Sequence, residues 1–310
     1  MDQVIAHAPA KINLGLEVLP TRAGEEKHRL NSIFCTTSLC DTLVYRFVSG
    51  SEPFNVRIKV LSPSLDTSYL KENDNTLTKT VEHFKRVYGF GFLPSGTLQV
   101  ELIKSIPVQA GLGGGSSDAA ALLKMLCWLV QVEPLSENSL AVARAVGADV
   151  PFFLHAPNRG FCALMGGYGD LLAAILPKPQ LHLMIVKPER GVSTKRAFAC
   201  FDELAERGIS IEPRSLDNGS IGDLADALTN GRQQAEIARL CQNDLEAAAM
   251  QILPQIDDLK AELLAFPGVL GAAMCGAGSS LFAICADAAA AHTSMQHFAN
   301  QGLWAVVVTT

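Results

Sequence analysis

Closely spaced cysteines, runs of one charge and long apolar runs are all missing from this sequence. The chain has 310 residues and a formal net charge of -6, with no run of five like charges. Neither a nucleic acid nor a membrane surface is therefore an expected partner. No uncharged apolar run approaches the ~18 residues of a membrane span, and the N-terminus lacks the basic-then-apolar order of a signal peptide. We expect a globular cytoplasmic protein.

The eight cysteines never come closer than five positions apart, so the sequence contains no CxxC pair. Their neighbours are apolar, which is typical of reduced, buried thiols and not of a zinc site or a disulfide framework. No other cluster has the spacing of metal ligands. We therefore predict no metal site built from protein side chains alone.

At roughly 100 to 200 residues per domain, a chain of this length is expected to form two domains. The pattern of strands and helices restarts after about Gly169, so we predict domains over 1–169 and 170–310. Short strands and helices that share a sheet favour an α+β class for the second domain.

Apolar periodicity predicts the individual elements. In the first half it predicts strands over 4–18, 32–37, 42–47, 55–61 and 97–104, and helices over 75–88, 117–131 and 137–146. A further short strand is expected from Pro151, where proline ends any helical continuation. In the second half it predicts strands over 181–187, 269–274, 281–285 and 303–308, and helices over 195–207, 233–250, 255–266 and 288–300.

The stretch PVQAGLGGGSSDAAALL, which begins at Pro107, has glycine at four of the five positions 111–115. Glycines let a ligand approach the main chain, and the unpaired N–H groups at a helix start attract anions. We expect Ser116, Ser117 and Asp118 to cap the helix that follows. The prediction is a phosphate site whose ATP-binding residues are Pro107, Val108, Gln109, Ala110, Gly111, Leu112, Gly113, Gly114, Gly115, Ser116 and Ser117, with Asn75 as a weaker candidate.

Two common phosphate motifs do not fit this loop. A Walker A loop requires a lysine directly before Ser or Thr after its last glycine, and none is present. A dinucleotide fingerprint requires an acidic residue at the end of a second parallel strand, but Pro134 directly follows Glu133, the acid at the right distance.

Four separate motifs carry a resemblance to one family. They are APAKINLGLEV near the start, the glycine loop, GADVPFFL at 147–154 and MCGAGSSLFAI at 274–284. In this order they resemble the small-molecule kinases that include galactokinase, homoserine kinase and mevalonate kinase. Together, APAKINL near the start, GADVPFF and KPERGVSTKRAF at 187–198 narrow the resemblance to the branch whose acceptor alcohol carries a cytidine diphosphate, on the methylerythritol phosphate route to isoprenoids.

The resemblance implies a fold and a mechanism. It implies an N-terminal domain of the ribosomal protein S5 type and a ferredoxin-like C-terminal domain, with ATP and substrate meeting in the cleft between them. By themselves, an Asp before Val-Pro is more typical of a turn, and a strand lysine of a solvated face. The resemblance instead makes Asp149 the base that takes the proton of the 2-hydroxyl and Lys11 the cation that keeps Asp149 ionised and faces the γ-phosphate. Mg²⁺ is expected with ATP, and the Ser117 hydroxyl is a candidate contact.

On the substrate side the resemblance implies contacts from Asn13, His28, Thr194, Phe198 and Gly276, with Phe198 stacking on the cytosine and Thr194 near the diphosphate. The family commonly shows Arg-x-Asp-Gly-Tyr-His here, whereas residues 22–28 read RAGEEKH, with Lys27 in place of the tyrosine. This difference leaves open another acceptor alcohol, such as mevalonate or homoserine. The same motifs would also fit a non-catalytic regulatory module. Such a module would be expected to lack Lys11 and Asp149, and both residues are present.

Overall fold

The computed structural model describes residues 3–21, 27–62, 76–157, 160–208 and 220–310. The chain divides into two compact units. Residues 1–10, 39–107 and 113–159 form unit 1, and residues 11–38, 108–112 and 160–310 form unit 2. Strands β1 (Val4–Val18) and β2 (Leu30–Ser49) contribute residues to both units. The units interleave along the chain, and the domain boundary predicted between residues 169 and 170 stays a prediction.

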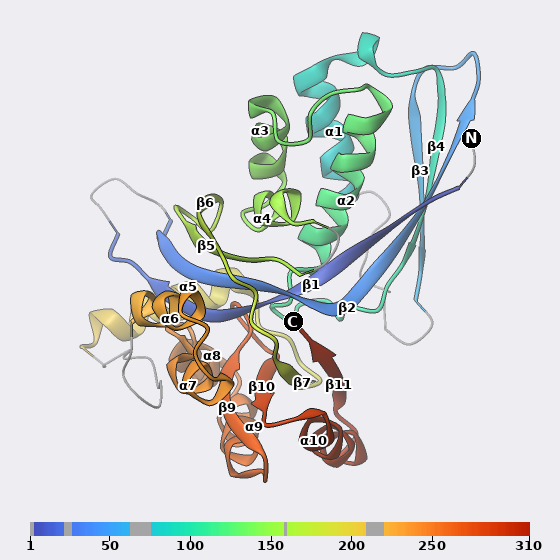
Figure 1. The fold of residues 1–310 in the computed structure, drawn as a ribbon. Coiled ribbons are helices and arrows are strands. Elements are labelled where there is room, and N and C mark those ends of the chain that lie inside the picture. Colours follow the sequence, from blue (N-terminus) through green and yellow to red (C-terminus); the bar gives the residue numbers. More distant parts are fainter. Residues whose placement is uncertain (1–2, 22–26, 63–75, 158–159, 209–219) are drawn as a thin grey trace. The chain divides into compact units, whose positions relative to one another are not determined.

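Unit 1 combines part of a mixed sheet with helices. Strand β3 (Asn55–Leu61) pairs in parallel with β4 (Gly96–Ile103), and β4 pairs antiparallel with residues 42–49 of β2. In β4, Leu98, Val100 and Leu102 are buried on one face, as strand alternation requires. Figure 1 shows three of the helices side by side, α1, α2 and α3. The helices of this unit are α1 (Thr76–Tyr88), the short 3-10 helix η1 (Phe90–Phe92), α2 (Gly114–Leu129), α3 (Glu137–Val146) and α4 (Val150–His155).

Unit 2 contains strands of the same sheet and a second, antiparallel sheet. In the first sheet, β8 (Gln242–Asn243) pairs in parallel with β1, β5 (Cys162–Gly166) pairs with β2, and β6 (Leu171–Leu176) pairs with β5. The second sheet has the order β11-β7-β10-β9. Its strands are β7 (His182–Lys187), β9 (Val269–Met274), β10 (Leu281–Cys285) and β11 (Trp304–Thr309). The helices are α5 (Thr194–Glu206), α6 (Ile221–Thr229), α7 (Gln234–Leu240), α8 (Glu246–Ile252), α9 (Gln255–Ala265) and α10 (Ala288–Asn300).

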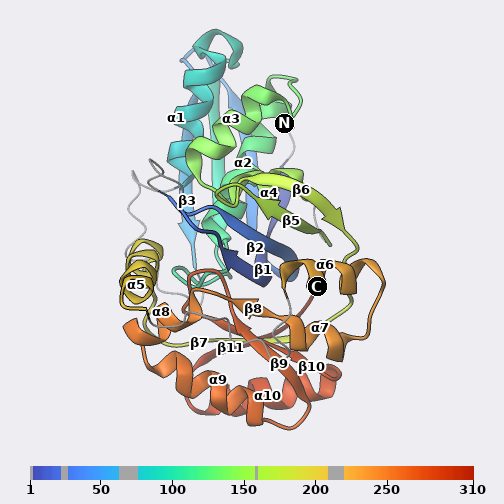
Figure 2. The same cartoon turned by 90° about the vertical axis from the view of Figure 1, so that its left-hand side faces the viewer.

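The second sheet follows the strand–helix–strand–strand–helix–strand order of a ferredoxin-like fold, because helices separate β7 from β9 and β10 from β11. Figure 2 shows α9 and α10 along this sheet. The α+β class and the ferredoxin-like second domain are therefore confirmed.

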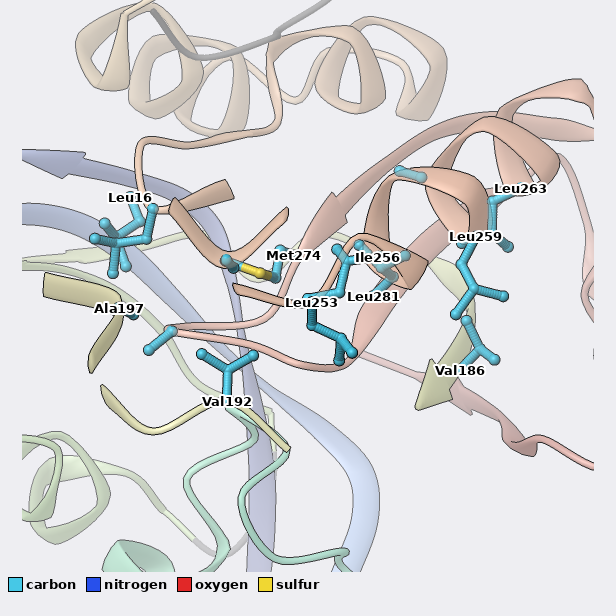
Figure 3. Packing of buried hydrophobic residues seen from close by; sticks show 14 of the residues in the cluster. Leu16, Val186, Val192, Ala197, Leu253, Ile256, Leu259, Leu263, Met274 and Leu281 are labelled. Carbon is cyan, nitrogen blue, oxygen red and sulfur yellow. The ribbon is translucent and has the colours of Figure 1, made fainter. Parts of the chain in front are cut away.

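The core of unit 2 fixes the end of β9 and the start of β10. Met274 and Leu281 are fully buried among apolar side chains from β7, α8 and α9 (Figure 3). Each buried leucine or methionine contributes about 1.5–3 kcal/mol relative to exposure. The turn 275–280 between the two strands is thus anchored at both ends by the core.

Two sequence predictions about local structure are wrong at the motifs that matter. The chain after Pro151 forms helix α4 and not a strand, because proline fits the first turn of a helix, where its missing N–H has no partner to lose. Helix α2 begins at Gly114, three residues before the predicted start, with left-handed Gly113 as its N-cap and no capping side-chain bond. Ser116, Ser117 and Asp118 therefore lie inside the helix and do not cap it.

Other differences concern continuity. The predicted strands 32–37 and 42–47 are parts of one strand, β2. The predicted helix 233–250 is interrupted by β8, because Gln242 and Asn243 are extended and pair with β1. The sequence patterns did not reveal β5, β6 or α6.

All eight cysteines are free thiols, and seven of them are buried, as predicted. No helix in the described part of the chain is long and apolar enough to cross a membrane.

Candidate active site

Lys11 and Asn13 stand two residues apart on β1, so their side chains lie on one face of the strand. Lys11 is 3% exposed, and its Nζ donates a hydrogen bond to Asn13 Oδ1 at 2.7 Å and lies 4.5 Å from the centre of the Phe34 ring. A buried ammonium is stable only with such partners. Unit 2 therefore holds one fixed positive charge on this strand.

The turn after β9 approaches the same lysine. The amide of Gly276 donates to Asn13 Oδ1 at 2.9 Å, and a Cβ at Gly276 would lie 3.4 Å from Lys11 Nζ. Asn243 holds the turn from the other side, since its Nδ2 donates to the carbonyls of Met274 at 2.8 Å and Gly276 at 2.7 Å. A side chain larger than hydrogen at residue 276 would crowd the ammonium.

The first half of the glycine loop, residues 108–112, packs against the same turn in unit 2. Gly111 has φ 74°, and a Cβ there would lie 1.8 Å from the carbonyl oxygen of Cys275, so only glycine fits. The carbonyl of Leu112 accepts the amide of Lys11 at 2.9 Å. A Cβ at Gly191, just before α5, would lie 2.8 Å from Gln109 Cβ. Segments from four parts of the chain thus meet in one place.

The second half of the loop opens helix α2 in unit 1. The first N–H groups of a helix have no partner within it, and here the N-cap, Gly113, has no side chain to cap them. Thr76 Oγ1 donates to the carbonyl of Gly115 at 2.8 Å, and a Cβ at Gly147 would lie 3.7 Å from Ser116 Oγ. Asp149 follows two residues later as the N-cap of α4. Unit 1 therefore places a helix N-terminus, which favours anions, against the segment that carries a carboxylate.

A buried charge cluster lies beneath the start of α2. Lys104 Nζ donates to Asp41 Oδ2 and, at 2.9 Å, to Asp118 Oδ2. Asp41 Oδ1 also accepts the amides of Ser105 and Ile106 at 2.6 and 2.9 Å. Lys104 Nζ lies 3.3 Å from where a Cβ of Gly114 would be, so the ammonium supports the first residue of the helix.

The pKa values of Asp118 and Lys104 are shifted in this cluster. Burial raises the pKa of Asp118 to about 8, and the nearby Asp41 adds to the effect, while Lys104 opposes it. For Lys104, burial lowers the pKa, but the charges of Asp118 and Asp41 outweigh burial and leave it raised. The Lys104 ammonium therefore remains charged beneath the start of α2.

The substrate-side candidates lie in unit 2. The His28 and Phe198 rings stack with centroids 5.5 Å apart and an angle of 13°, and His28 Nε2 is 2.8 Å from Asp202 Oδ1. Thr194 is the exposed first residue of α5, a helix N-terminus without a side-chain cap. Lys27 is exposed. Residues 22–26 of the divergent segment and Asn75 lie outside the described residues.

The structure brings the predicted residues together in groups. Lys11, Asn13 and Gly276 meet Gly111 and Leu112 in unit 2, and His28 meets Phe198 in the same unit. Gly114, Gly115 and Ser116 share unit 1 with Asp149. Of the remaining loop candidates, Pro107 and Ala110 are buried and Val108 is half-buried. The individual roles of these residues stay predictions.

Sequence reasoning missed the residues that support these groups. Asn243 and Glu246 both bond the backbone of β9 or its turn, since Glu246 Oε1 accepts the amide of Met274 at 2.8 Å and pairs with Lys260. Their signal was the polar run QNDLE inside an otherwise apolar helical pattern at 242–246. Lys104 and Asp41 had no such signal, because a charged residue at the end of a predicted strand is usually exposed to solvent, and Asp118 was expected only as a helix cap.

The chain belongs to the GHMP kinases. The model of the GHMP kinases N terminal domain matches residues 75–156, and the model of the GHMP kinases C terminal matches residues 215–300. The fold agrees: a solved homoserine kinase from Cytophaga hutchinsonii is similar with a TM-score of 0.67 and 21% identity, covering 100% of this chain and 95% of that one.

Within this family, two similar curated proteins bear the same name. A 4-diphosphocytidyl-2-C-methyl-D-erythritol kinase of Desulfitobacterium hafniense is 33% identical over 286 residues, covering 91% of this chain and 87% of that protein. The protein of that name from Methylorubrum extorquens is 32% identical over 306 residues and covers 98% of both chains. A crystal structure of 4-(cytidine 5'-diphospho)-2C-methyl-D-erythritol kinase has a TM-score of 0.72 and 27% identity, with 99% of this chain and 100% of that chain covered.

Proposed function

We propose that this chain transfers the γ-phosphoryl group of ATP to the 2-hydroxyl of 4-diphosphocytidyl-2-C-methyl-D-erythritol, in the cytoplasm, as a step in isoprenoid precursor synthesis. The relatives described above support the substrate. The observation that carries the activity is the meeting of Lys11 with the glycine loop and the Gly276 turn, because it combines a cation with bare backbone. Phosphoryl transfer needs such positioning and charge neutralisation more than covalent help.

Each group has a proposed role in the transfer. The open amides at the start of α2 and the loop at Gly111 bind the ATP phosphates, and Lys11 stabilises negative charge on the transferred group. Asp149 accepts the proton of the attacking hydroxyl as it bonds to phosphorus. The leaving oxygen remains on ADP.

Mg²⁺ accompanies ATP in this proposal and screens its phosphate charge. The described residues contain no group of three or more His, Cys, Asp or Glu side chains that could hold a metal ion. A Mg²⁺ ion bound mainly by phosphate oxygens and water needs few protein ligands, which is its usual state in kinases. No step of the transfer depends on a protein-bound metal site.

The cytidine side is proposed for unit 2. Phe198 presents a ring for stacking and His28 a ring nitrogen for the base edge, while the N-terminus of α5 at Thr194 offers amides to the diphosphate. In the structure the two rings stack on each other, so the base would take the place of His28 on the face of Phe198.

Replacing Asp149 with Asn tests the proposed base. Turnover should fall by about 10²–10⁴-fold, the usual contribution of a positioned base, while ATP affinity stays within about twofold. The matched control is Asp258→Asn, which makes the same change at an exposed position of α9. Unchanged turnover in Asp149→Asn would mean that another group takes the proton.

The acceptor is tested separately with Mg-ATP. The divergent segment 22–28 is the feature that favours another alcohol, and the homoserine kinase likeness concerns the fold alone. The ratio kcat/KM should be highest for the cytidine-bearing alcohol, by at least tenfold over mevalonate and homoserine. A preference for either of the latter would overturn the proposed substrate but not the kinase activity.

A further inference from the structure

A groove of about 270 Å³ lies on the sheet of unit 1, and the proposed phosphoryl transfer uses none of the residues that line it. Strands β2, β4 and β3 lie side by side at this groove (Figure 1). In β4, Leu98 and Leu102 are buried on one face of the sheet, so Gln99 and Glu101 point to the opposite face and line the groove. The groove is therefore polar along its central strand.

The strand register places an arginine on each side of Gln99. Arg46 of β2 is the antiparallel partner of Gln99, and Arg57 of β3 is its parallel partner. Neighbouring strands are about 4.8 Å apart, so the two arginine backbones are roughly 10 Å apart and all three side chains lie on one face. Both guanidinium groups can therefore reach one ligand that lies over Gln99.

The side chains of this row have unused hydrogen-bond donors. Both arginines are exposed, and within the described ranges neither Arg46, Arg57 nor Gln99 has an ion pair or a side-chain hydrogen bond. The next row differs, because Lys59 Nζ lies 3.8 Å from Glu101 Oε1. Two positive charges in the groove thus have no acidic partner among the described residues.

Phosphate groups suit this pair of arginines. A guanidinium binds two phosphate oxygens through parallel N–H donors, and such charge-assisted bonds are about twice as strong as neutral hydrogen bonds. Because the arginines stand on opposite sides of Gln99, one phosphate group could not use both forks fully. Two linked phosphates can occupy one fork each, and the Gln99 amide can donate to an oxygen between them.

The charge of the whole chain favours a small ligand over a macromolecule. The formal net charge is -6, and the sequence has no run of five like charges that would extend a basic surface beyond the groove. Glu101 stands in the row beside the two arginines. A nucleic acid needs many phosphate contacts along its length, so it would meet repulsion outside the groove.

We propose that Arg46, Gln99 and Arg57 form a second anion site, which binds the diphosphate group of a small molecule. Arg46 binds one phosphate, Arg57 binds the other, and Gln99 donates to the oxygens between them. The proposal does not depend on the proposed phosphoryl transfer, because none of the three residues has a part in it.

Inorganic diphosphate is the probe for this site. The full-length protein carries ¹⁵N-arginine, and the Nε–H signals of the two arginines are assigned from their loss in Arg46→Lys and Arg57→Lys. At constant ionic strength and without metal, diphosphate should shift both signals saturably and with one dissociation constant. Inorganic phosphate should bind at least tenfold more weakly, since it occupies only one fork at a time.

Arg57→Gln tests the two-arginine geometry, with the Arg46 signal as the readout. Diphosphate should bind this variant at least tenfold more weakly, because one set of charge-assisted bonds is lost. Arg144→Gln removes the same charge at an exposed position of α3 in the same unit and should change the affinity by less than twofold.

Three results would overturn the proposal. Diphosphate that leaves either arginine signal unshifted would show that the groove does not bind it. Equal losses of affinity in Arg57→Gln and Arg144→Gln would show attraction by overall charge only. A ten-nucleotide single-stranded DNA that saturates both signals at a lower concentration than diphosphate would assign the groove to nucleic acid.

Discussion

Replacing Gly111 with Ala should damage both stability and turnover, and the structure gives the size of the effect. Gly111 has φ 74°, where an alanine costs about 1–2 kcal/mol. Its Cβ would lie 1.8 Å from the carbonyl oxygen of Cys275, while real Cβ contacts stay above 3.0 Å. The two segments would therefore have to move apart by the difference, at least 1.2 Å. The obstacle is backbone, which cannot rotate away. Overpacking of this kind costs about 1–3 kcal/mol more.

Gly208→Ala is the matched control in the same unit. Gly208 has φ 66°, and no heavy atom of the residues that the structure describes lies within 4 Å of the added methyl group, so this variant has the backbone strain without the clash. In urea unfolding, both variants should show the same dependence of unfolding free energy on urea concentration. The unfolding free energy of Gly111→Ala should be about 1–3 kcal/mol lower than that of Gly208→Ala. Because the displaced loop contacts the Lys11 backbone, Gly111→Ala should also lose at least tenfold in kcat/KM for ATP, and Gly208→Ala should not.

Two results would refute this reasoning. Equal destabilisation by both substitutions would show that the loop and the Cys275 turn do not press on each other. A stability loss in Gly111→Ala with unchanged ATP kinetics would show that the contact is structural only and that the loop does not form part of the nucleotide site.

Three further changes have defined outcomes. Burial raises the pKa of Asp118 from 3.8 to about 8, so the native state keeps a proton that the unfolded chain has lost. The unfolding free energy should therefore fall as pH rises from about 4 to 8. Urea unfolding midpoints measured at pH 5 and pH 8 should differ less in Asp118→Asn than in the wild type. Asn243→Ala removes two bonds to backbone carbonyls and should cost about 2–4 kcal/mol in unfolding free energy and lower kcat/KM, whereas an unchanged kcat/KM would remove Asn243 from the support of the Gly276 turn. Phe198→Ala should raise KM for the cytidine substrate about threefold to tenfold and leave KM for ATP unchanged, and an equal rise in both would argue against base stacking.

Local sequence was sufficient where one physical rule dominated. The bounds of β3, α3, β9, β10 and α10 follow the predicted ranges, because alternation or helical spacing and a clear end signal agree there. The motif order led to the family, since glycine, lysine and aspartate at those spacings have few other uses together.

Local sequence failed where a distant contact overrode the local pattern. Residues 242–243 read as helix, but β1 offers a strand edge, and their backbone pairs with it. Pro151 reads as a stop, but in the first turn of α4 it loses no hydrogen bond. Serines in the glycine loop read as caps, yet Gly113 takes the cap position, because its left-handed backbone starts the helix earlier.

The sequence by itself determined the class of chemistry, because its signals are local. They are glycines before a helix, a lysine in a strand and an aspartate before Val-Pro, and their order along the chain can be recognised without the structure. Only the tertiary structure decided how the parts are held. Asn243 fixes the Gly276 turn, Lys104 supports the start of α2, and the carbonyl of Cys275 forbids a side chain at Gly111. These contacts join residues 10 to more than 160 positions apart, and burial, which sets their strength and pKa values, exists only once the chain is folded.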